Sequence, residues 1–206
     1  GNEPGDVKRW FTDFGFRCAG LHGGIAQLDD LDSCLGYMDQ METPYLICSG
    51  VGDYKSKGLD AYREAADKFM DAGQRLADQG RVLCYHNHSF EFQDYDGTRG
   101  IDVLFSETDP KVVKACIDTY WVRHGEDDPV EFIKQHSDRV ALLHLKDYKD
   151  GKFADVGDGE IDFTSVIELG SQYDVEWATV ENDQPRDPAI ESIRISRRYM
   201  REELGI

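Results

Sequence analysis

The sequence lacks any apolar run close to the roughly 20 residues that a helix needs to cross a bilayer. It is also poor in basic residues: 23 Lys and Arg stand against 41 Asp and Glu, which gives a formal net charge of −18. Such a surface repels nucleic-acid phosphates and anionic lipids, so we expect no nucleic acid and no membrane among the partners. Solubility alone is the simpler explanation of the charge, although the charge also suits a site that holds a cation.

A paired cysteine motif is absent as well. The five cysteines show no CxxC spacing, and at least three of them, Cys48, Cys84 and Cys116, lie in apolar runs. Thiols in such runs behave as small core residues and indicate a reducing compartment, so we expect a cytoplasmic protein. The chain begins with Gly1 instead of Met, so the sequence leaves open whether a signal peptide precedes it.

Short apolar runs alternate with longer segments of helical period along the whole chain. The runs that we predict to be buried parallel strands are residues 16–20, 44–49, 81–85, 113–118, 140–145 and 177–181. The predicted helices are residues 27–41, 58–79, 100–108, 129–136, 162–173 and 187–204. This alternation predicts an α/β fold with a parallel sheet and helices outside it.

The Gly-rich phosphate fingerprint of a doubly wound sheet is also missing, because the segment after the first predicted strand reads LHGGIAQ. Metal-capable residues follow several late strands instead, as they do in a (β/α) TIM barrel. We therefore predict one barrel domain over residues 1–206. Six strands are predicted where a complete barrel has eight, so we expect the chain to lack the first one or two βα units.

Four strand ends carry residues that can bind a metal or move a proton. In an extended strand, His86 and His88 point to the same face. The segments are CYHNHSFEF with His86, His88 and Glu91, CIDTYW with Asp118 and Trp121, LLHLKD with His144 and Lys146, and WATVEND with Glu181 and Asp183.

Glu91, Asp118, His144 and Glu181 lie on consecutive units, each about one strand, one helix and two loops from the next. Residues spaced in this way can reach a common barrel axis. Three carboxylates and one imidazole suit one divalent cation such as Mn²⁺, Mg²⁺, Co²⁺ or Zn²⁺, which can polarise a sugar oxygen. Each residue also has a simpler explanation: a strand-end Asp commonly caps a helix, and Lys146 with Asp147 can form an ordinary surface ion pair.

At these motifs the sequence resembles the sugar phosphate isomerase/epimerase family of xylose isomerase-like TIM barrels. YHNHSFEF, CIDTYW, LLHLKD, VGDGEIDF and TVEND are similar to the strand-end blocks of that family, in the same order, from about Phe16 to the C-terminus. The resemblance implies a divalent metal held by Glu91, Asp118, His144 and Glu181. Ketose epimerases of the family have a Glu where this chain has Tyr85, so Glu91 or the histidines must supply the first ligand. Family members usually begin with about two further βα units.

The resemblance implies an isomerase or epimerase that transfers a proton at a carbon next to a sugar carbonyl. Glu181, His86 and His88 are the candidate bases, and Lys146 is expected to hold a substrate oxygen or phosphate. The residues expected to contact the substrate are Trp121, His22 and Asn87. The expected partner is a small sugar or sugar derivative, and the sequence leaves room for a homo-oligomer.

Three other functions stay open. A dehydratase on the same scaffold would begin with the same proton abstraction and then expel a hydroxide, with a histidine as general acid. An endonuclease would need several metals and a basic groove, which the net charge of −18 argues against. A non-catalytic sugar-binding relic is the third alternative.

The loop VGDGEID, residues 156–162, either folds over the site or is only a turn.

Overall fold

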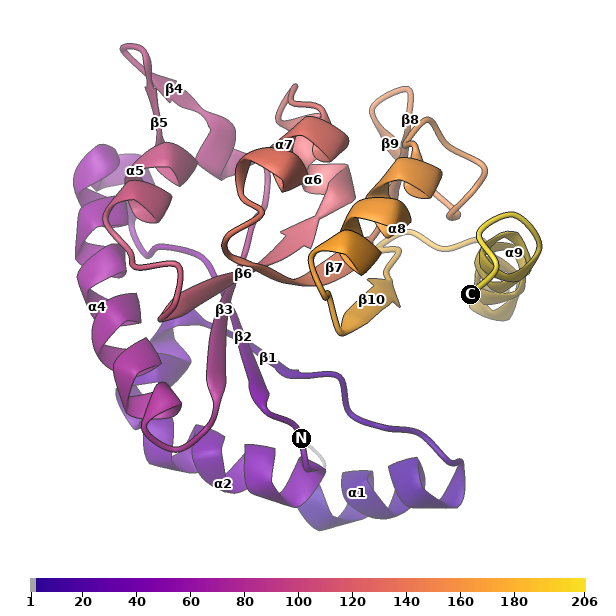
Figure 1. The fold of residues 1–206 in the computed structure, drawn as a ribbon, viewed down its shortest axis with the longest axis horizontal. Coiled ribbons are helices and arrows are strands. Elements are labelled where there is room, and N and C mark those ends of the chain that lie inside the picture. The colour runs from indigo at the N-terminus through magenta and orange to yellow at the C-terminus, as the bar shows by residue number, and fades with distance from the viewer. Residues whose placement is uncertain (1–2) are drawn as a thin grey trace. The chain divides into compact units, whose positions relative to one another are not determined.

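A computed structural model describes residues 3–206, which belong to two compact units. The first unit comprises residues 3–86 and Tyr95–Lys114, and the second comprises Asn87–Asp94 and Ala115–Ile206. Each unit is an α/β structure with parallel strands and flanking helices (Figure 1). Within residues 3–206, no helix combines the length and the apolar character that crossing a membrane requires.

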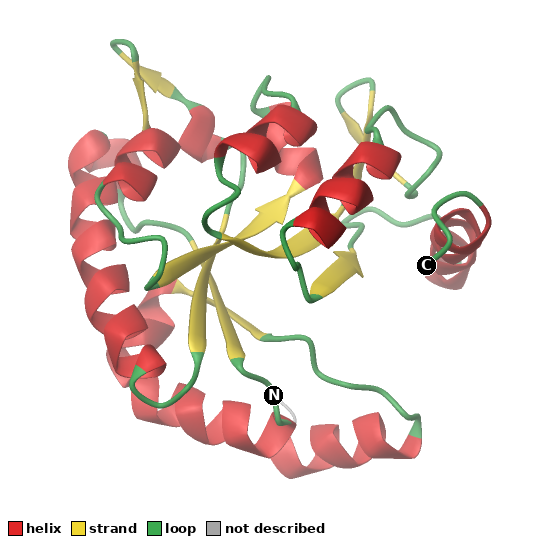
Figure 2. Cartoon of the chain, in the orientation of Figure 1, coloured by secondary structure: helices red, strands yellow, loops and turns green. Residues whose placement is uncertain are grey.

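In the first unit, β2 lies between β1 and β3, and all three strands are parallel. Helices α2 and α4 contact β2 and β3 and lie on one side of these strands (Figure 2). Tyr85 of β3 is buried against this helical layer, where its ring packs edge-to-face on Phe69 of α4 with centroids 5.3 Å apart. The elements of this unit are α1 (Pro4–Asp13), β1 (Leu21–Gly24), a 3₁₀ segment (Ile25–Asp30), α2 (Leu31–Met41), β2 (Tyr45–Ser49), α3 (Tyr54–Lys57), α4 (Leu59–Ala77), β3 (Val82–His86) and α5 (Gly100–Ser106), with the short strands β4 (Asp94–Tyr95) and β5 (Thr98–Arg99) before α5.

In the second unit, β7 lies between β6 and β10, again with all strands parallel. The register places His144 of β7 beside Asp118 of β6 and Thr179 of β10, so the carboxyl ends of the three strands are level. Helices α7 and α8 pack against each other (Figure 1). The elements are a 3₁₀ turn (Phe90–Phe92), β6 (Val113–Asp118, in this unit from Ala115), α6 (Thr119–His124), α7 (Pro129–Gln135), β7 (Val140–Leu145), β8 (Asp147–Lys149), β9 (Lys152–Ala154), α8 (Phe163–Gln172), β10 (Trp177–Val180) and α9 (Ala189–Glu202).

Five of the six predicted strands are confirmed to within about two residues, but the strand predicted at residues 16–20 is wrong. That segment is irregular, and β1 begins only at Leu21. Its apolar character has another cause: Phe16 is 65 % exposed and its ring lies 6.1 Å from that of Phe11 at the end of α1. The helix predicted at residues 27–41 is divided, because the Asp30 side chain accepts a hydrogen bond from the Ser33 N–H and starts α2 anew.

Candidate metal and substrate site in the second unit

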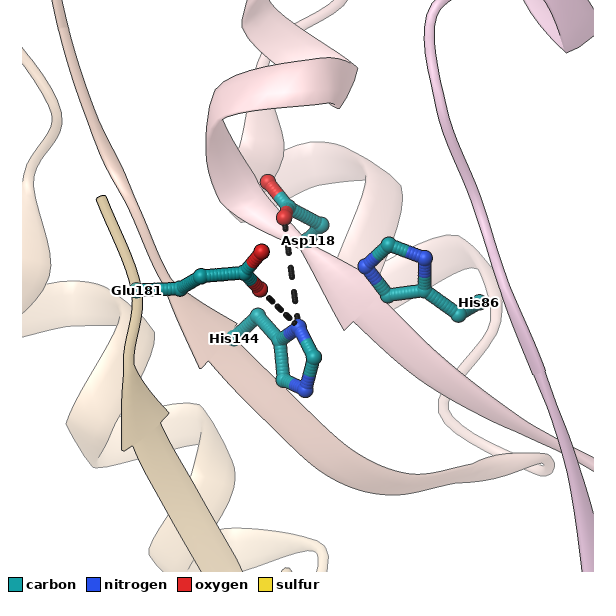
Figure 3. A group of neighbouring side chains, drawn as sticks. All are labelled: His86, Asp118, His144 and Glu181. Atoms are coloured by element: carbon teal, nitrogen blue, oxygen red, sulfur yellow. Dashed lines mark ion pairs between the residues drawn. The ribbon is translucent and has the colours of Figure 1, made fainter. Parts of the chain in front are cut away.

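Asp118, His144 and Glu181 meet at the carboxyl ends of β6, β7 and β10. One potential ligand atom from each lies within 4.8 Å of the others (Figure 3). The Nδ1 atom of His144 is 2.6 Å from Oε2 of Glu181 and 4.0 Å from Oδ2 of Asp118. The backbone sets this arrangement, because Asp118 is in register with His144 and the Glu181 N–H donates to the Leu145 carbonyl of β7 at 3.1 Å.

Asp118 also has two structural roles, apart from its contribution to this cluster of potential ligands. Its side chain accepts a hydrogen bond from the Trp121 N–H at 3.1 Å and so caps α6. Its backbone is paired with the Asn87 side chain, which accepts from the Asp118 N–H at 3.0 Å and donates to the Asp118 carbonyl at 3.3 Å. Asp118 is fully buried, and this burial raises the pKa of its carboxyl group well above the ordinary value.

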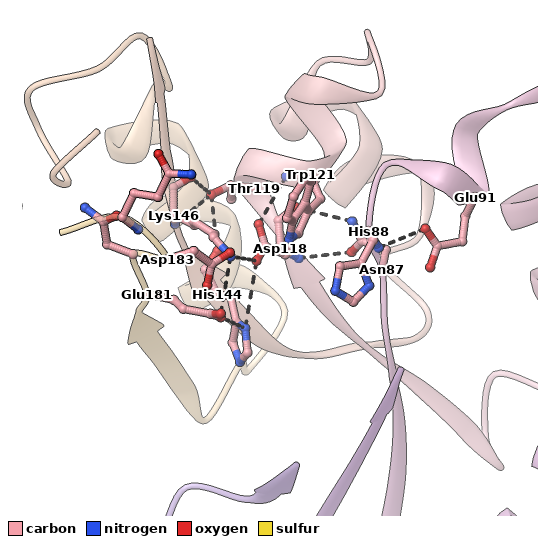
Figure 4. Close-up of polar contacts among 12 residues, drawn as sticks. Asn87, His88, Glu91, Asp118, Thr119, Trp121, His144, Lys146, Glu181 and Asp183 are labelled. Atoms are coloured by element: carbon pink, nitrogen blue, oxygen red, sulfur yellow. Dashed lines mark hydrogen bonds and ion pairs between the residues drawn. The ribbon is translucent and has the colours of Figure 1, made fainter. Parts of the chain in front are cut away.

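Lys146 brings a buried positive charge to the same place, at 1 % exposure. Its Nζ lies 2.7 Å from Asp183 Oδ2, 3.2 Å from Glu181 Oε1 and 3.8 Å from Asp118 Oδ2 (Figure 4). Burial by itself lowers the pKa of Lys146, but the three carboxylates outweigh it and the pKa is raised. Lys146 is therefore an ammonium ion at neutral pH and a hydrogen-bond donor.

Glu181 is held in its ionised form by its neighbours. The hydrogen bond from His144 is the largest cause that lowers the pKa of Glu181 far below its ordinary value, with Lys146 contributing in the same direction. A carboxylate of this kind is a weak base and a good ligand for a cation. Two carboxylates and one imidazole, two of the three buried, form a donor set that fits a divalent metal ion.

Glu91 does not join this group among the residues that the structure describes. It is fully buried in the turn after residues 87–89, where its Oε2 accepts a hydrogen bond from the His88 N–H at 2.9 Å. The His88 ring lies 5.4 Å from the Trp121 ring. In the first unit, the His86 ring lies 4.9 Å from that of His22, so the two predicted histidines of that unit are neighbours.

The alternative that Lys146 and Asp147 form a surface ion pair is wrong, because both are 1 % exposed and have different partners. The Asp147 carboxylate accepts backbone hydrogen bonds from Gly157 at 3.0 Å and Gly159 at 2.9 Å, and from Ile161 at 3.3 Å. Asp147, two residues after the end of β7, thereby holds the loop of residues 156–162.

Some residues of the site have no clear signal in the sequence. Thr119, the residue after β6, is hydrogen-bonded to Lys146, the residue after β7. Its hydroxyl accepts a hydrogen bond from the Lys146 N–H at 3.1 Å and donates one to the Lys146 carbonyl at 2.9 Å. Its position directly after Asp118 is the only hint in the sequence. Phe153 of β9 covers Lys146, with Nζ 5.2 Å from the ring centre, and nothing in the local sequence indicates this contact. Asp183 stands in a predicted motif, but its pairing with Lys146 requires the folded strand end.

Comparisons with known proteins agree with this architecture. The sequence signature of the xylose isomerase-like TIM barrel family matches residues 12–202, so the chain belongs to that family and has its fold, as predicted. Among curated relatives, the chain is 32% identical over 191 residues to inosose dehydratase of Geobacillus thermodenitrificans and 29% identical over 191 residues to that of Clostridium botulinum. Each alignment covers 81% of this chain and 61% of the relative. The chain thus spans about three fifths of the length of these relatives.

A solved structure of a sugar phosphate isomerase/epimerase from Parabacteroides distasonis is similar in fold. It superimposes with a TM-score of 0.85 at 21% sequence identity, covering 98% of this chain and 76% of that one. At this level of identity the likeness concerns the fold.

Proposed function

We propose that this protein uses one divalent metal ion to remove a proton from a carbon next to the carbonyl of a sugar or sugar derivative, as an isomerase or epimerase. The observation that carries this proposal is the convergence of ligand atoms from Asp118, His144 and Glu181 within 4.8 Å, next to the buried Lys146. The names of the similar proteins, inosose dehydratase and sugar phosphate isomerase/epimerase, support a polyhydroxylated substrate.

Asp118, His144 and Glu181 would hold the metal, which when bound supplies Lewis-acid polarisation of a substrate oxygen. Glu91 stays a predicted fourth ligand. Lys146, fixed by Asp183 and Glu181, would donate a hydrogen bond to the oxygen on which negative charge develops.

The pKa of Glu181, lowered by His144, favours its role as a ligand over its role as a base. The proton would then pass to one of the predicted histidine bases, His86 or His88, whose ordinary pKa lies near neutrality. Of these, His88 stands beside Trp121, the residue predicted to contact the sugar ring.

A dehydratase is the second candidate, and the names of the curated relatives favour it. The same proton would leave the carbon next to the carbonyl. The electron pair would then form a carbon–carbon double bond while the neighbouring C–O bond breaks, and the departing hydroxide would take a proton from a histidine and leave as water. An isomerase would return the proton to carbon or oxygen and keep every hydroxyl group.

The metal site is tested by elemental analysis of the purified protein after incubation with Mn²⁺ and removal of free ion. We expect about one divalent ion per chain in the wild type and none in Asp118→Ala, because Asp118 is a buried ligand. Asp71→Ala, an exposed position on α4, is the control and should retain the ion. Equal metal content in Asp118→Ala and the wild type would reject this ligand set.

The two reactions are separated by incubating the Mn²⁺-loaded protein with ketohexoses and with cyclic polyhydroxy ketones in D₂O. Deuterium at the carbon next to the carbonyl, with the mass otherwise unchanged, indicates isomerase or epimerase activity. A product lighter by one water indicates dehydratase activity. If a panel of such compounds shows neither change and the metal is present, the non-catalytic sugar-binding alternative is favoured. A single barrel domain, a cytoplasmic location and a homo-oligomer stay predictions.

A further inference from the structure

A hollow of about 580 Å³ lies at the surface of the second unit beside the candidate site. This volume is in the range of pockets that bind small organic molecules. The hollow is lined by the β8–β9 hairpin and by the chain that follows β10. Its lining includes Phe153, Asn182 and Gln184. Asn182 directly follows Glu181 in the chain, so the lining of the hollow is adjacent in sequence to a candidate metal ligand.

The Phe153 side chain lines the hollow and also contacts Lys146 of the candidate site. The ring stacks on Tyr120 with centroids 4.2 Å apart and meets Trp121 edge-to-face at 5.7 Å. The Lys146 Nζ lies 5.1 Å from the centre of the Trp121 ring and 5.2 Å from that of Phe153. A ligand held at Lys146 and Trp121 therefore has a continuous aromatic surface that leads over Phe153 into the hollow.

The charges around the hollow are balanced. Arg186 is paired with both Asp155 and Asp158, and Lys149 donates from Nζ to the Asp158 carbonyl at 3.0 Å. An anion such as a phosphate would have to displace these carboxylates from Arg186 and would be repelled by them. Amide groups, mixed charges and one aromatic ring match instead a neutral ligand rich in hydroxyl groups, since hydroxyls both donate and accept.

We infer that the hollow is a subsite for a neutral, hydroxyl-rich group attached to the reacting sugar, such as the second ring of a glycoside. This inference rests on the proposed function, and it gives the substrate class: a glycoside or similarly extended sugar derivative, in preference to a free monosaccharide or a sugar phosphate. Trp121 would contact the ring at the site, and Phe153, Gln184 and Lys152 would contact the second ring.

The test is a comparison of binding, by isothermal titration calorimetry, of methyl glucosides, the disaccharides maltose and cellobiose, and glucose 6-phosphate. We expect at least one disaccharide to bind about tenfold more tightly than the methyl glucosides and the sugar phosphate. Gln184→Ala and Lys152→Ala should each weaken disaccharide binding about fivefold, the effect of one lost hydrogen bond, and leave methyl glucoside binding unchanged. Both residues are exposed and lie outside the candidate metal site. Gln172→Ala, exposed at the end of α8, is the control.

Equal affinities for the disaccharides and the methyl glucosides would overturn the inference. So would tight binding of glucose 6-phosphate that Lys152→Ala removes, because the hollow would then be an anion site. These affinities are measured without turnover. A failure of the subsite therefore appears as equal affinities, whereas a failure of the proposed function appears as a missing metal ion.

Discussion

Lys146 is a buried lysine surrounded by carboxylates, with Asp118, Glu181 and Asp183 all within 3.8 Å of its Nζ. A buried charge is retained in a protein only when it is paired, and here the pairing is mutual, because Asp118 is buried as well. In the proposed enzyme, Lys146 and the metal ion would therefore share the carboxylates of Asp118 and Glu181.

Replacing Lys146 by Met should separate these two roles. Met is similar in length but has no charge, so we expect Lys146→Met to retain about one Mn²⁺ per chain while deuterium exchange into substrate falls by at least about 10²-fold, as for a lost electrostatic donor. Elemental analysis and mass spectrometry measure the two quantities. Lys134→Met, at an exposed position on α7, is the control. Unchanged exchange in Lys146→Met would exclude Lys146 from the reaction.

Asp118 combines a candidate ligand with a helix cap, so two substitutions distinguish the functions. Asn can still accept the hydrogen bond from Trp121 N–H, whereas Ala cannot. We expect both variants to lose the metal, and Asp118→Ala to be less stable than Asp118→Asn by about 1 kcal/mol. Urea unfolding of the metal-free proteins measures this difference. If the two variants unfold at the same urea concentration, the cap contributes nothing to stability.

At the scale of elements, the Asp147 carboxylate of β8 is a main attachment of the loop of residues 156–162. This carboxylate accepts hydrogen bonds from the backbone N–H groups of Gly157, Gly159 and Ile161. There is no room for a larger residue at one of these positions: a Cβ on Gly159 would lie 2.1 Å from Asp147 Oδ1. The loop is therefore a fixed part of the structure next to the site.

Gly159→Ala and Asp147→Ala should both detach this loop. Asp147→Ala removes three partly buried hydrogen bonds, and Gly159→Ala places a Cβ against the Asp147 carboxylate. We therefore expect a loss of about 3 kcal/mol in the free energy of unfolding and new proteolytic cleavage within residues 156–162. Gly36→Ala is a matched control, because Gly36 is exposed in α2 and a Cβ there meets nothing within 4 Å. That variant should be as stable as the wild type or more stable. Resistance of both loop variants to protease would show that other contacts hold the loop.

At the scale of the whole molecule, the dominant feature is the net charge of −18. The exposed ion pairs of the structure, such as Lys57 with Glu64 and Lys134 with Glu131, engage only part of the acidic residues, since Asp and Glu outnumber Lys and Arg by 41 to 23. The excess carboxylates repel one another more in the compact state than in the unfolded chain.

Raising the salt concentration should therefore stabilise the protein. Between 0.01 and 0.15 M NaCl the screening length falls from about 30 to about 8 Å, which weakens repulsion across the surface more than it weakens close ion pairs. We expect the thermal midpoint of the metal-free protein to rise over this range, as measured by circular dichroism. A midpoint that falls with salt would mean that the surface ion pairs outweigh the net repulsion.

The predictable parts of the fold are those in which sequence pattern and burial agree. Residues 140–145 are apolar except for His144, and β7 occupies them without any shift. The N-terminal region was less predictable, because Phe16 and Cys18 look like strand residues although Phe16 is exposed after α1. In a short segment, the sequence does not show whether an apolar side chain is buried in a core or packs on a neighbouring aromatic ring at the surface.

The sequence by itself determined five of the six predicted parallel strands, the family, and the positions of Asp118, His144, Lys146 and Glu181 at or just after strand ends. Periodicity and strand ends are local properties, so they can be read along the chain. Only the tertiary structure decided which of these side chains meet. It joined Asp118, His144 and Glu181, kept Glu91 apart on the His88 backbone, and buried Lys146 and Asp147 with different partners. The physical reason is that strand register and loop attachment depend on contacts between residues far apart in the chain, which no local pattern encodes.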